Sequence, residues 1–184
     1  MASTLRILAW NANGLLQHKK LLQVTLIEQN IHVCLISETH FTRESYLKLG
    51  GFDVYHTTHP SNCARGSSAV IVKTSLSHYE DVKIEKAEYQ VTSAKLKTST
   101  GAITVAAIYS PPRHNLKRGD YLSLLQSFSG KFIIGGDFNS KHTCWGSRLT
   151  NTKGNELHQA IQEYHCEVLT TGKPTYWPTD LNKI

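Results

Sequence analysis

The sequence predicts an α/β fold in which a mixed β-sheet sandwich is covered by helices. A strand–helix–strand pattern opens the chain, with two short apolar runs on either side of a helical repeat. The middle of the chain is rich in β-forming residues and contains a hairpin pattern. Because helical patterns occur near both ends with hairpins between them, a mixed sheet fits better than a purely parallel one.

The first elements follow from apolar runs and breakers. Residues 5–10 (LRILAW) predict a strand that ends at the breaker Asn11-Ala12-Asn13-Gly14. An amphipathic helix is expected over Lys19–Gln29, because apolar residues recur at helical spacing at Leu21, Val24, Ile27 and Ile31, with Leu22 and Leu26 beside them. Residues 33–36 (VCLI) predict a second, buried strand that stops at Ser37-Glu38-Thr39.

The remaining elements complete the mixed pattern. Four segments are rich in β-forming residues: Ala69–Thr74, Val82–Lys86, Glu88–Thr98 and Ala102–Tyr109. The turn at residues 98–101 predicts that the last two form a hairpin. Residues 121–128 predict a short helix, and residues 131–134 (KFII) predict a buried strand that ends at Gly135-Gly136-Asp137-Phe138-Asn139. A final helix is marked by Leu157, Ala160, Ile161 and Tyr164.

Length and composition predict one soluble globular domain. The chain has 184 residues, of which 40% are hydrophobic and 18% charged, and it contains no internal repeat or linker. No apolar run approaches the roughly 18–20 residues that a membrane span needs. The first residues lack the charged and apolar regions of a signal peptide.

Charge and cysteine content narrow the expected partners. Lys and Arg number 20 against 14 Asp and Glu, which gives a net charge of +6 and favours a polyanion such as nucleic acid. The excess lies mainly between residues 61 and 130, and a moderately basic solvated surface is the alternative explanation. The four cysteines are far apart and the ten histidines are scattered, so we expect reduced thiols and no zinc site.

Polar residues follow four of the buried strands directly. They lie in Trp10–Gly14, Ser37–His40, Ile108–Pro111 and Gly136–Asn139. Strand ends are where a rigid sheet presents side chains to a binding site. Taken alone, a glutamate after a strand is usually a cap or a surface group, and the Gly-Gly-Asp-Phe-Asn segment is also typical of a turn with Asx capping.

Together these residues point to phosphate ester hydrolysis. Glu38 and Asp137 are hard oxygen ligands suited to Mg²⁺ or Mn²⁺. Asn11 and Asn139 can orient a ligand, a water or a phosphate oxygen, and Tyr109 offers a phenolic donor to the same phosphate. Such a set can polarise a phosphodiester and position an attacking water without a covalent intermediate. Hydrolysis of a phosphomonoester with the same groups is the second possibility.

The ordered motifs resemble the endonuclease/exonuclease/phosphatase superfamily over essentially the whole chain. These motifs are WNANG at 10–14, SET at 37–39, IYSPP at 108–112, GGDFN at 135–139 and TYW at 175–177. The segments ARGSSA at 64–69, DFNSKH at 137–142 and CWG at 144–146 narrow the resemblance to the apurinic-endonuclease-like domain of non-LTR (LINE-type) retrotransposons, with jockey-like elements closest.

This resemblance implies both a fold and an activity. The fold would be a four-layer α/β sandwich, with two packed mixed β-sheets flanked by helices. The activity would be Mg²⁺-dependent nicking of double-stranded DNA, leaving a 3′-hydroxyl that primes reverse transcription. A reverse transcriptase would follow in a larger polypeptide, made in the cytoplasm and acting on nuclear DNA. Target choice would depend on loop shape and DNA deformability.

The resemblance also assigns roles residue by residue. Glu38 would be the main metal ligand, and Asn11 would help to organise the metal site. Asp137 would align or activate the attacking water, Asn139 would hold the phosphate or that water, and Tyr109 would contact the phosphate.

Other residues carry two interpretations each. His142 either approaches the catalytic centre or is a structural histidine near Trp145. Trp145 and Tyr176 either stack on DNA or belong to the core. Three basic residues either contact phosphates or are exposed without a role: Arg65, Lys117 and Arg118.

The sequence departs from the family pattern at two places. Asn13, a substrate-contact candidate, stands where cellular repair relatives carry an acidic residue, which puts abasic-site preference in doubt. The family ends with a strand carrying an Asp and then a Ser-Asp-His motif, which no residue of this sequence matches; Asp180 comes too early to be its partner. We therefore expect the domain to lack its C-terminal strands. An inactive remnant that still binds DNA, or a small-molecule phosphatase, remains as an alternative.

Overall fold

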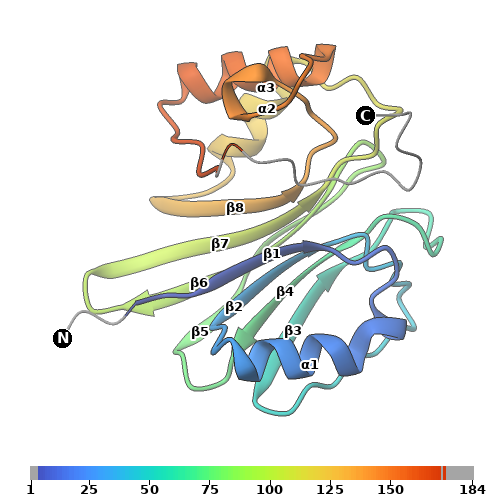
Figure 1. The fold of residues 1–184 in the computed structure, drawn as a ribbon, viewed down its shortest axis with the longest axis vertical. Helices are drawn as coiled ribbons and strands as arrows, with labels where there is room; N and C mark the ends of the chain where they lie inside the picture. The colour runs from blue at the N-terminus through green and yellow to red at the C-terminus, as the bar shows by residue number, and fades with distance from the viewer. Residues whose placement is uncertain (1–3, 171, 173–184) are drawn as a thin grey trace. The chain divides into compact units, whose positions relative to one another are not determined.

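The protein is described by a computed structural model covering residues 4–170 and 172. The described residues form two compact units. The first unit consists of residues from 1–114 and 127–138, and the second of residues from 115–126 and 139–184. Figure 1 shows the helices and strands of each unit. No helix in the described part of the chain combines the length and apolarity that crossing a membrane requires.

The first sheet of the first unit has four strands. They are β1 (Ile7–Asn11), β2 (Val33–Ser37), β3 (Phe52–Thr57) and β4 (Ser68–Lys73), in the order β1-β2-β4-β3. β1 and β2 are parallel, whereas β4 is antiparallel to both β2 and β3. The predicted strand–helix–strand opening is thus present, and the sheet is mixed.

The connection from β1 to β2 passes through a short 3₁₀ helix, η1 (Leu16–His18), and α1 (Lys19–Glu28). The bounds of α1 agree with the predicted helix to one residue. Its buried side chains are Leu22 and Leu26, while three apolar residues that suggested the helix are exposed: Leu21, Val24 and Ile27. The predicted helix is confirmed, and Leu22 and Leu26, which lie beside the residues at helical spacing, form its buried face.

The second sheet is also mixed. Its strands are β5 (His78–Glu85), β6 (Gln90–Thr98), β7 (Gly101–Tyr109) and β8 (Lys131–Asp137), in that order. β5, β6 and β7 are successively antiparallel, and β8 runs parallel to β7. The predicted hairpin is confirmed, since β6 and β7 pair from Gln90–Tyr109 to Thr98–Gly101.

The two sheets pack face to face, with β2 and β4 lying against β6 and β7. The core between them is aliphatic: Val33, Leu35, Val70, Val72, Ala94, Leu96, Val105 and Ala107. The other face of the first sheet packs on α1, where Cys34 and Ile36 join Leu22 and Leu26. β2 is therefore buried on both faces, which explains its uninterrupted apolar sequence.

The second unit holds two helices, α2 (Arg118–Gln126) and α3 (Thr152–Glu163), and the 3₁₀ helix η2 (Thr143–Trp145). Glu156 on α3 accepts a hydrogen bond from the Arg118 backbone N–H at 2.8 Å, at the beginning of α2. Asn151 caps α3, because its side chain accepts the Gly154 N–H at 2.7 Å. Both helices were expected, although α2 begins three residues earlier than the predicted start.

Two local expectations were wrong. β3 was not predicted, because Asp53 and His56 interrupt its apolar pattern; it is stabilised by pairing along its length with β4. Gly135 and Gly136 were expected to form a turn, but both belong to β8 and pair with Ala107 and Ile108. Glycine is needed there because of close packing, and the chain does not bend away until after Asp137.

Candidate functional site

Four strands of the first unit end at one place. β1 and β2 end side by side, with Asn11 paired to Ser37. β7 and β8 do the same in the other sheet, with Tyr109 paired to Asp137. β8 also lies against β1 and β2, so the ends of both sheets meet, as the arrowheads of β1, β7 and β8 show in Figure 1. The polar residues that follow these strands in the sequence are therefore neighbours in space.

The Asn11 amide joins the two sheets at this place. Its Nδ2 donates hydrogen bonds to Glu38 Oε1 at 3.0 Å and to Asp137 Oδ2 at 2.9 Å. Its Oδ1 accepts the backbone N–H of Asn13 at 3.1 Å. A flipped amide would set its oxygen against two carboxylates and its nitrogen against an N–H donor, so the contacts themselves determine the orientation. Asn11 thus places its nitrogen, not its oxygen, next to the carboxylates.

Glu38 is held in an unusual backbone conformation. Its φ is +53°, in the left-handed region that costs an ordinary residue about 1–2 kcal/mol. Backbone hydrogen bonds on both sides stabilise it: Glu38 O accepts the Gly14 N–H at 2.8 Å, and the His40 N–H donates to Gly66 O at 3.0 Å. Such conformations cluster at functional sites, where the surrounding structure imposes them.

His40 is a site residue that the sequence reasoning missed. Its Nε2 lies 3.8 Å from Glu38 Oε2, and both side chains are partly exposed. The only sequence signal was its position two residues beyond Glu38. Sequence spacing alone does not indicate that the backbone turns back between them; the positive φ angles of both residues produce that turn.

Asp137 is positioned by Ser37, a second residue that the sequence reasoning did not single out. The fully buried Ser37 hydroxyl donates to Ile108 O at 2.9 Å and accepts the Asp137 N–H at 2.8 Å. Gly136 makes this contact possible, since a Cβ there would lie 2.1 Å from Ile108 O and 2.8 Å from Ser37 Oγ. One hydroxyl therefore links the end of β2 to the ends of β7 and β8.

Tyr109 lies beside the carboxylates as a neutral phenol. Burial raises its pKa to about 12, with the negative charges of Glu38 and Asp137 adding to the effect and the positive charge of Arg113 opposing it. At neutral pH the hydroxyl consequently keeps its proton and can donate a hydrogen bond. The β3–β4 loop packs on its ring, because Gly66 leaves room where a Cβ would lie 2.7 Å from two ring carbons.

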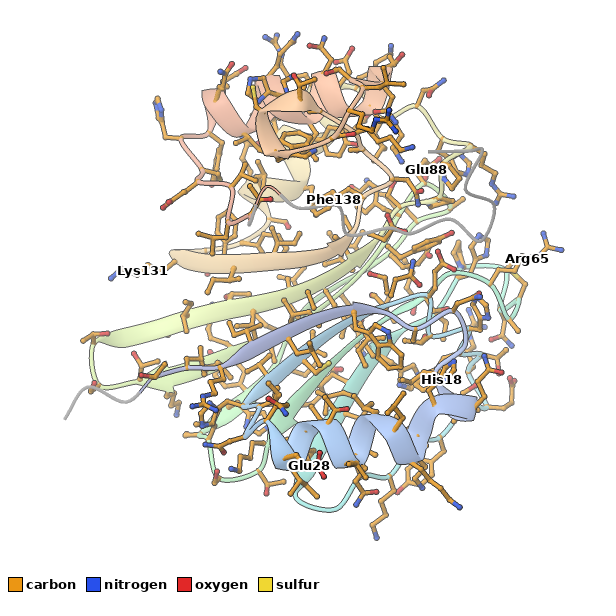
Figure 2. The ribbon with its side chains drawn as sticks, in the orientation of Figure 1. His18, Glu28, Arg65, Glu88, Lys131 and Phe138 are labelled. Carbon is orange, nitrogen blue, oxygen red and sulfur yellow. The ribbon has the colours of Figure 1, made fainter. Side chains whose placement is uncertain are left out.

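Two further predicted residues lie on the loops of the first unit. Asn13 has a φ of +42°, and its carbonyl accepts a hydrogen bond from Gln17 Nε2 at 3.0 Å while its side chain is exposed. Arg65 lies on the β3–β4 loop, and Figure 2 shows its side chain extending outward from that loop.

Asn139 and His142 belong to the second unit. Asn139 has a φ of +48°, and its carbonyl accepts a hydrogen bond from Asn151 Nδ2 at 3.2 Å. His142 is buried, and its Nδ1 caps η2 by accepting the Cys144 N–H at 3.1 Å. Burial and the neighbouring His158 lower the pKa of His142.

Trp145 packs in the same cluster. Its ring lies 4.9 Å from that of His142, which in turn stacks on His158 at 4.1 Å between centroids. The side-chain ligand atoms of His142, Cys144 and His158 lie within 4.8 Å of one another, which is close enough for three residues to hold a metal ion. In this arrangement His142 uses Nδ1 for the η2 cap, and the stacked rings give the cluster a packing role. Tyr176 lies outside the described residues.

The donor set around Asn11 fits a hard divalent cation. The carboxylates of Glu38 and Asp137 converge on one neutral amide, that of Asn11, which brings two hard oxygen ligands together. Mg²⁺ binds through one or two carboxylates and otherwise keeps waters or substrate phosphate oxygens. Glu38 would hold such an ion beside Asp137, with Asn11 fixing the orientation of both carboxylates.

Comparisons with known proteins identify a matching family and a related sequence. Residues 103–184 match the family described as endonuclease-reverse transcriptase. The chain is 38% identical, over 174 residues, to the RNA-directed DNA polymerase from the mobile element jockey of Drosophila melanogaster; the alignment covers 95% of this chain. The chain spans 19% of the length of that relative.

Solved structures share the fold. The endonuclease domain of TRAS1, a telomere-specific non-LTR retrotransposon, matches with a TM-score of 0.73 and 21% identity, covering 97% of this chain and 80% of that one. The AP endonuclease of Leishmania major matches with a TM-score of 0.67 and 12% identity, over 86% and 66% of the two chains. The expected class of two mixed sheets with flanking helices is confirmed. The predicted resemblance is confirmed as well: the chain is related in sequence to jockey-like elements, and it has the endonuclease/exonuclease/phosphatase fold of a non-LTR retrotransposon endonuclease domain.

Proposed function

We propose that this chain is a divalent-metal-dependent DNA endonuclease domain, which nicks double-stranded DNA and leaves a 3′-hydroxyl for reverse transcription. The single Asn11 amide that holds Glu38 and Asp137 together carries the proposal. It brings two carboxylates from different sheets to one point, where a metal ion and a phosphate can be bound together. The relationship to polymerases of mobile elements supports DNA as the substrate.

The side chains divide the chemistry among them. A bound Mg²⁺ or Mn²⁺ would act as a Lewis acid on the scissile phosphate. Glu38 would hold the ion, with Asn11 fixing the carboxylate. Asp137 would align or activate the attacking water. Its position suits this role because its backbone is held by Ser37 and its carboxylate by Asn11. Tyr109, kept neutral by its raised pKa, would donate a hydrogen bond to a phosphate oxygen.

Residues of the second unit enter the proposal through the sequence motif. Asn139 follows Asp137 by two positions and would hold the phosphate or the attacking water. His142 and Trp145 keep their place in the packed cluster around η2. We further propose that the domain works within a longer polypeptide that carries a reverse transcriptase, because the RNA-directed DNA polymerase of jockey is about five times as long. Such a polypeptide would be made in the cytoplasm and would act on nuclear DNA.

A plasmid-nicking assay tests the proposal. Supercoiled plasmid is incubated with Mg²⁺ and the chain, or the chain extended by its downstream reading frame, and the open-circular product is measured. Glu38→Gln and Asp137→Asn should each lower the nicking rate by at least about a hundredfold, the range seen when one electrostatic catalytic group is lost. Glu28→Gln, an exposed charge at the end of α1 (Figure 2), is the matched control and should nick normally.

The outcomes separate the three functions. Absence of nicking by both forms would refute the endonuclease and leave an inactive DNA-binding remnant. Release of phosphate from mononucleotides or inositol phosphates, without cutting of DNA, would support the phosphatase instead. Nicking by this chain alone would show that a terminal Ser-Asp-His motif is dispensable.

A further inference from the structure

A pocket lies next to Tyr109, outside the pair of carboxylates. Its volume is approximately 150 Å³. The residues of the first unit that line it include His59, Arg65, Tyr109, Pro111, Pro112 and Arg113. Tyr109 belongs both to this pocket and to the carboxylate site, since it lines the pocket and pairs with Asp137 in the β7–β8 register. A molecule that contacts the carboxylate site can therefore extend past Tyr109 into the pocket.

The pocket combines rigid apolar walls with a cationic rim. The Tyr109 ring and the rings of Pro111 and Pro112 are flat or fixed in shape, so they lose little conformational freedom when a ligand packs on them. Arg65 and Arg113 are exposed at its edge. A sugar ring with an attached phosphate fits such a pocket, because its apolar carbon skeleton can pack on the walls while its charged phosphate lies at the cationic rim.

The positive charges at the rim lack a carboxylate partner. Within residues 4–170 and 172, no Asp or Glu oxygen lies within 4.0 Å of the charged nitrogens of Arg65 or Arg113. The positive charges of Arg113 and Arg65 also reinforce the lowering of the His59 pKa, whose main cause is burial. These groups line the same pocket, and an external anion bound there would offset their positive charge.

His59 adds a donor to the same rim. Its Nδ1 accepts the Ser61 backbone N–H at 3.2 Å, so the neutral ring carries its proton on Nε2. The lowered pKa favours this neutral form near pH 7. The imidazole can then donate a hydrogen bond to an anion that the two guanidinium groups attract.

The β3–β4 loop is built to hold Arg65 beside Tyr109. Gly66 has a φ of +63° and lies against the Tyr109 ring. The next residue, Ser67, is buried; its N–H donates to Gln90 Oε1 at 3.1 Å and its hydroxyl donates to Phe41 O at 3.0 Å. Gln90 is itself fully buried, opposite Tyr109 in the β6–β7 register. The position of the Arg65 backbone is therefore determined by the core.

We propose that this pocket binds the phosphate and deoxyribose of the nucleotide next to the scissile phosphate on the cleaved DNA strand. This rests on the proposed nuclease function and adds a positioning role to it. Arg65, Arg113 and His59 hold the neighbouring phosphate, while Tyr109 and the two prolines pack on its sugar. The contact is to the backbone, so it strengthens binding to all sequences and presents the next phosphate to the carboxylates.

The first test measures binding without catalysis. Anisotropy of a fluorescent DNA duplex is recorded in EDTA, over a series of salt concentrations, for the double variant Arg65→Ala/Arg113→Ala. Its Kd should rise at least about tenfold, and the slope of log K against log salt should flatten by about 1, the change expected when one phosphate is no longer neutralised. The control Lys97→Ala/Lys131→Ala removes the same charge at the opposite end of the second sheet. It should change the slope by less than half as much.

The second test identifies the phosphate. Duplexes carrying one neutral methylphosphonate at successive positions are bound to the wild-type and variant chains. At one position, the methylphosphonate should raise the Kd of the wild-type chain by the same factor as the Arg65→Ala/Arg113→Ala substitution does. At that position it should not raise the Kd of the double variant any further. Equal Kd values for the two double variants, or equal sensitivity of wild type and variant at every position, would overturn the proposal.

Nicking separates this proposal from the one on which it rests. If the chain nicks DNA, the sensitive methylphosphonate must lie next to the cut, and KM must rise in the Arg65→Ala/Arg113→Ala variant while kcat changes little. If nicking proceeds with an unchanged KM, the pocket proposal fails and the nuclease stands. If the chain binds without nicking, the nuclease fails, and the pairing of variant with methylphosphonate decides whether the pocket holds a phosphate.

Discussion

Replacing Ser37 with alanine removes the hydroxyl that joins the ends of three strands. That hydroxyl is fully buried, donates to Ile108 O at 2.9 Å and accepts the Asp137 N–H at 2.8 Å. The substitution leaves the side-chain volume almost unchanged, so little of its effect comes from packing. It also leaves both carboxylates of the candidate site in place. Any loss of activity must therefore come from the position of Asp137.

The contacts determine the expected magnitude. Losing the hydrogen bond to Ile108 O should cost about 1 kcal/mol, and leaving the Asp137 N–H without its buried partner should cost a further 1–3 kcal/mol or so. We expect the free energy of unfolding to fall by about 2–4 kcal/mol. A buried hydroxyl with a single contact provides the comparison. Within the described part of the chain, the Ser93 hydroxyl makes one hydrogen bond, donating to Val82 O at 2.8 Å, and its replacement should cost about 1–1.5 kcal/mol.

Urea unfolding and plasmid nicking together measure both effects. Ser37→Ala should unfold at a lower urea concentration than Ser93→Ala, and its kcat for nicking should fall roughly tenfold, the result of a small displacement of a catalytic group. Ser93→Ala should retain wild-type kcat under conditions in which both variants are folded. If the two variants are equally stable and equally active, the Ser37 bridge does not position Asp137 and the reasoning is refuted.

Three other outcomes follow from the structure. Asn11→Ala should raise the Mg²⁺ concentration needed for nicking several-fold, since both carboxylates lose their shared donor; an unchanged metal titration would contradict this. Gly66→Ala should lower stability by about 1–2 kcal/mol, because it strains a φ of +63° and crowds the Tyr109 ring, and thermal unfolding would measure the loss. Because the folded-state pKa of His142 is lowered, the unfolded chain binds that proton first as the pH falls below about 6.5, so stability should fall there, whereas His142→Gln should lose less in the same pH titration.

The elements of regular structure were largely readable from local patterns. Apolar runs such as residues 33–36 indicated strands because both faces of β2 are buried, and the turn at residues 98–101 indicated the hairpin because turn chemistry acts over a few residues. β3 was not predicted because its stability comes from pairing with β4, a contact that leaves no signature in the local sequence. The apolar spacing predicted α1 correctly but not which of its two adjacent apolar stripes is buried, because periodicity alone cannot distinguish them.

The candidate site was partly readable for a different reason. Residue type and position after a strand made Glu38 and Asp137 candidates, because several polar strand ends taken together suit a metal and phosphate site, which a single one does not indicate. Ser37 and His40 carried no such signal. Ser37 matters through a hydroxyl shared by β7 and β8, and His40 through a backbone turn that returns it to Glu38.

The sequence by itself determined the order of the strands along the chain, the residue types at their ends and the kind of metal those residues suit. These are properties of short segments, set by side-chain chemistry and local backbone preference. Only the tertiary structure decided which strand ends meet. Packing of the two sheets brings Asn11 from one to Asp137 from the other, and it sets Tyr109 between the carboxylates and a cationic pocket. The Asn11–Asp137 contact joins residues more than a hundred positions apart, and no local pattern encodes it.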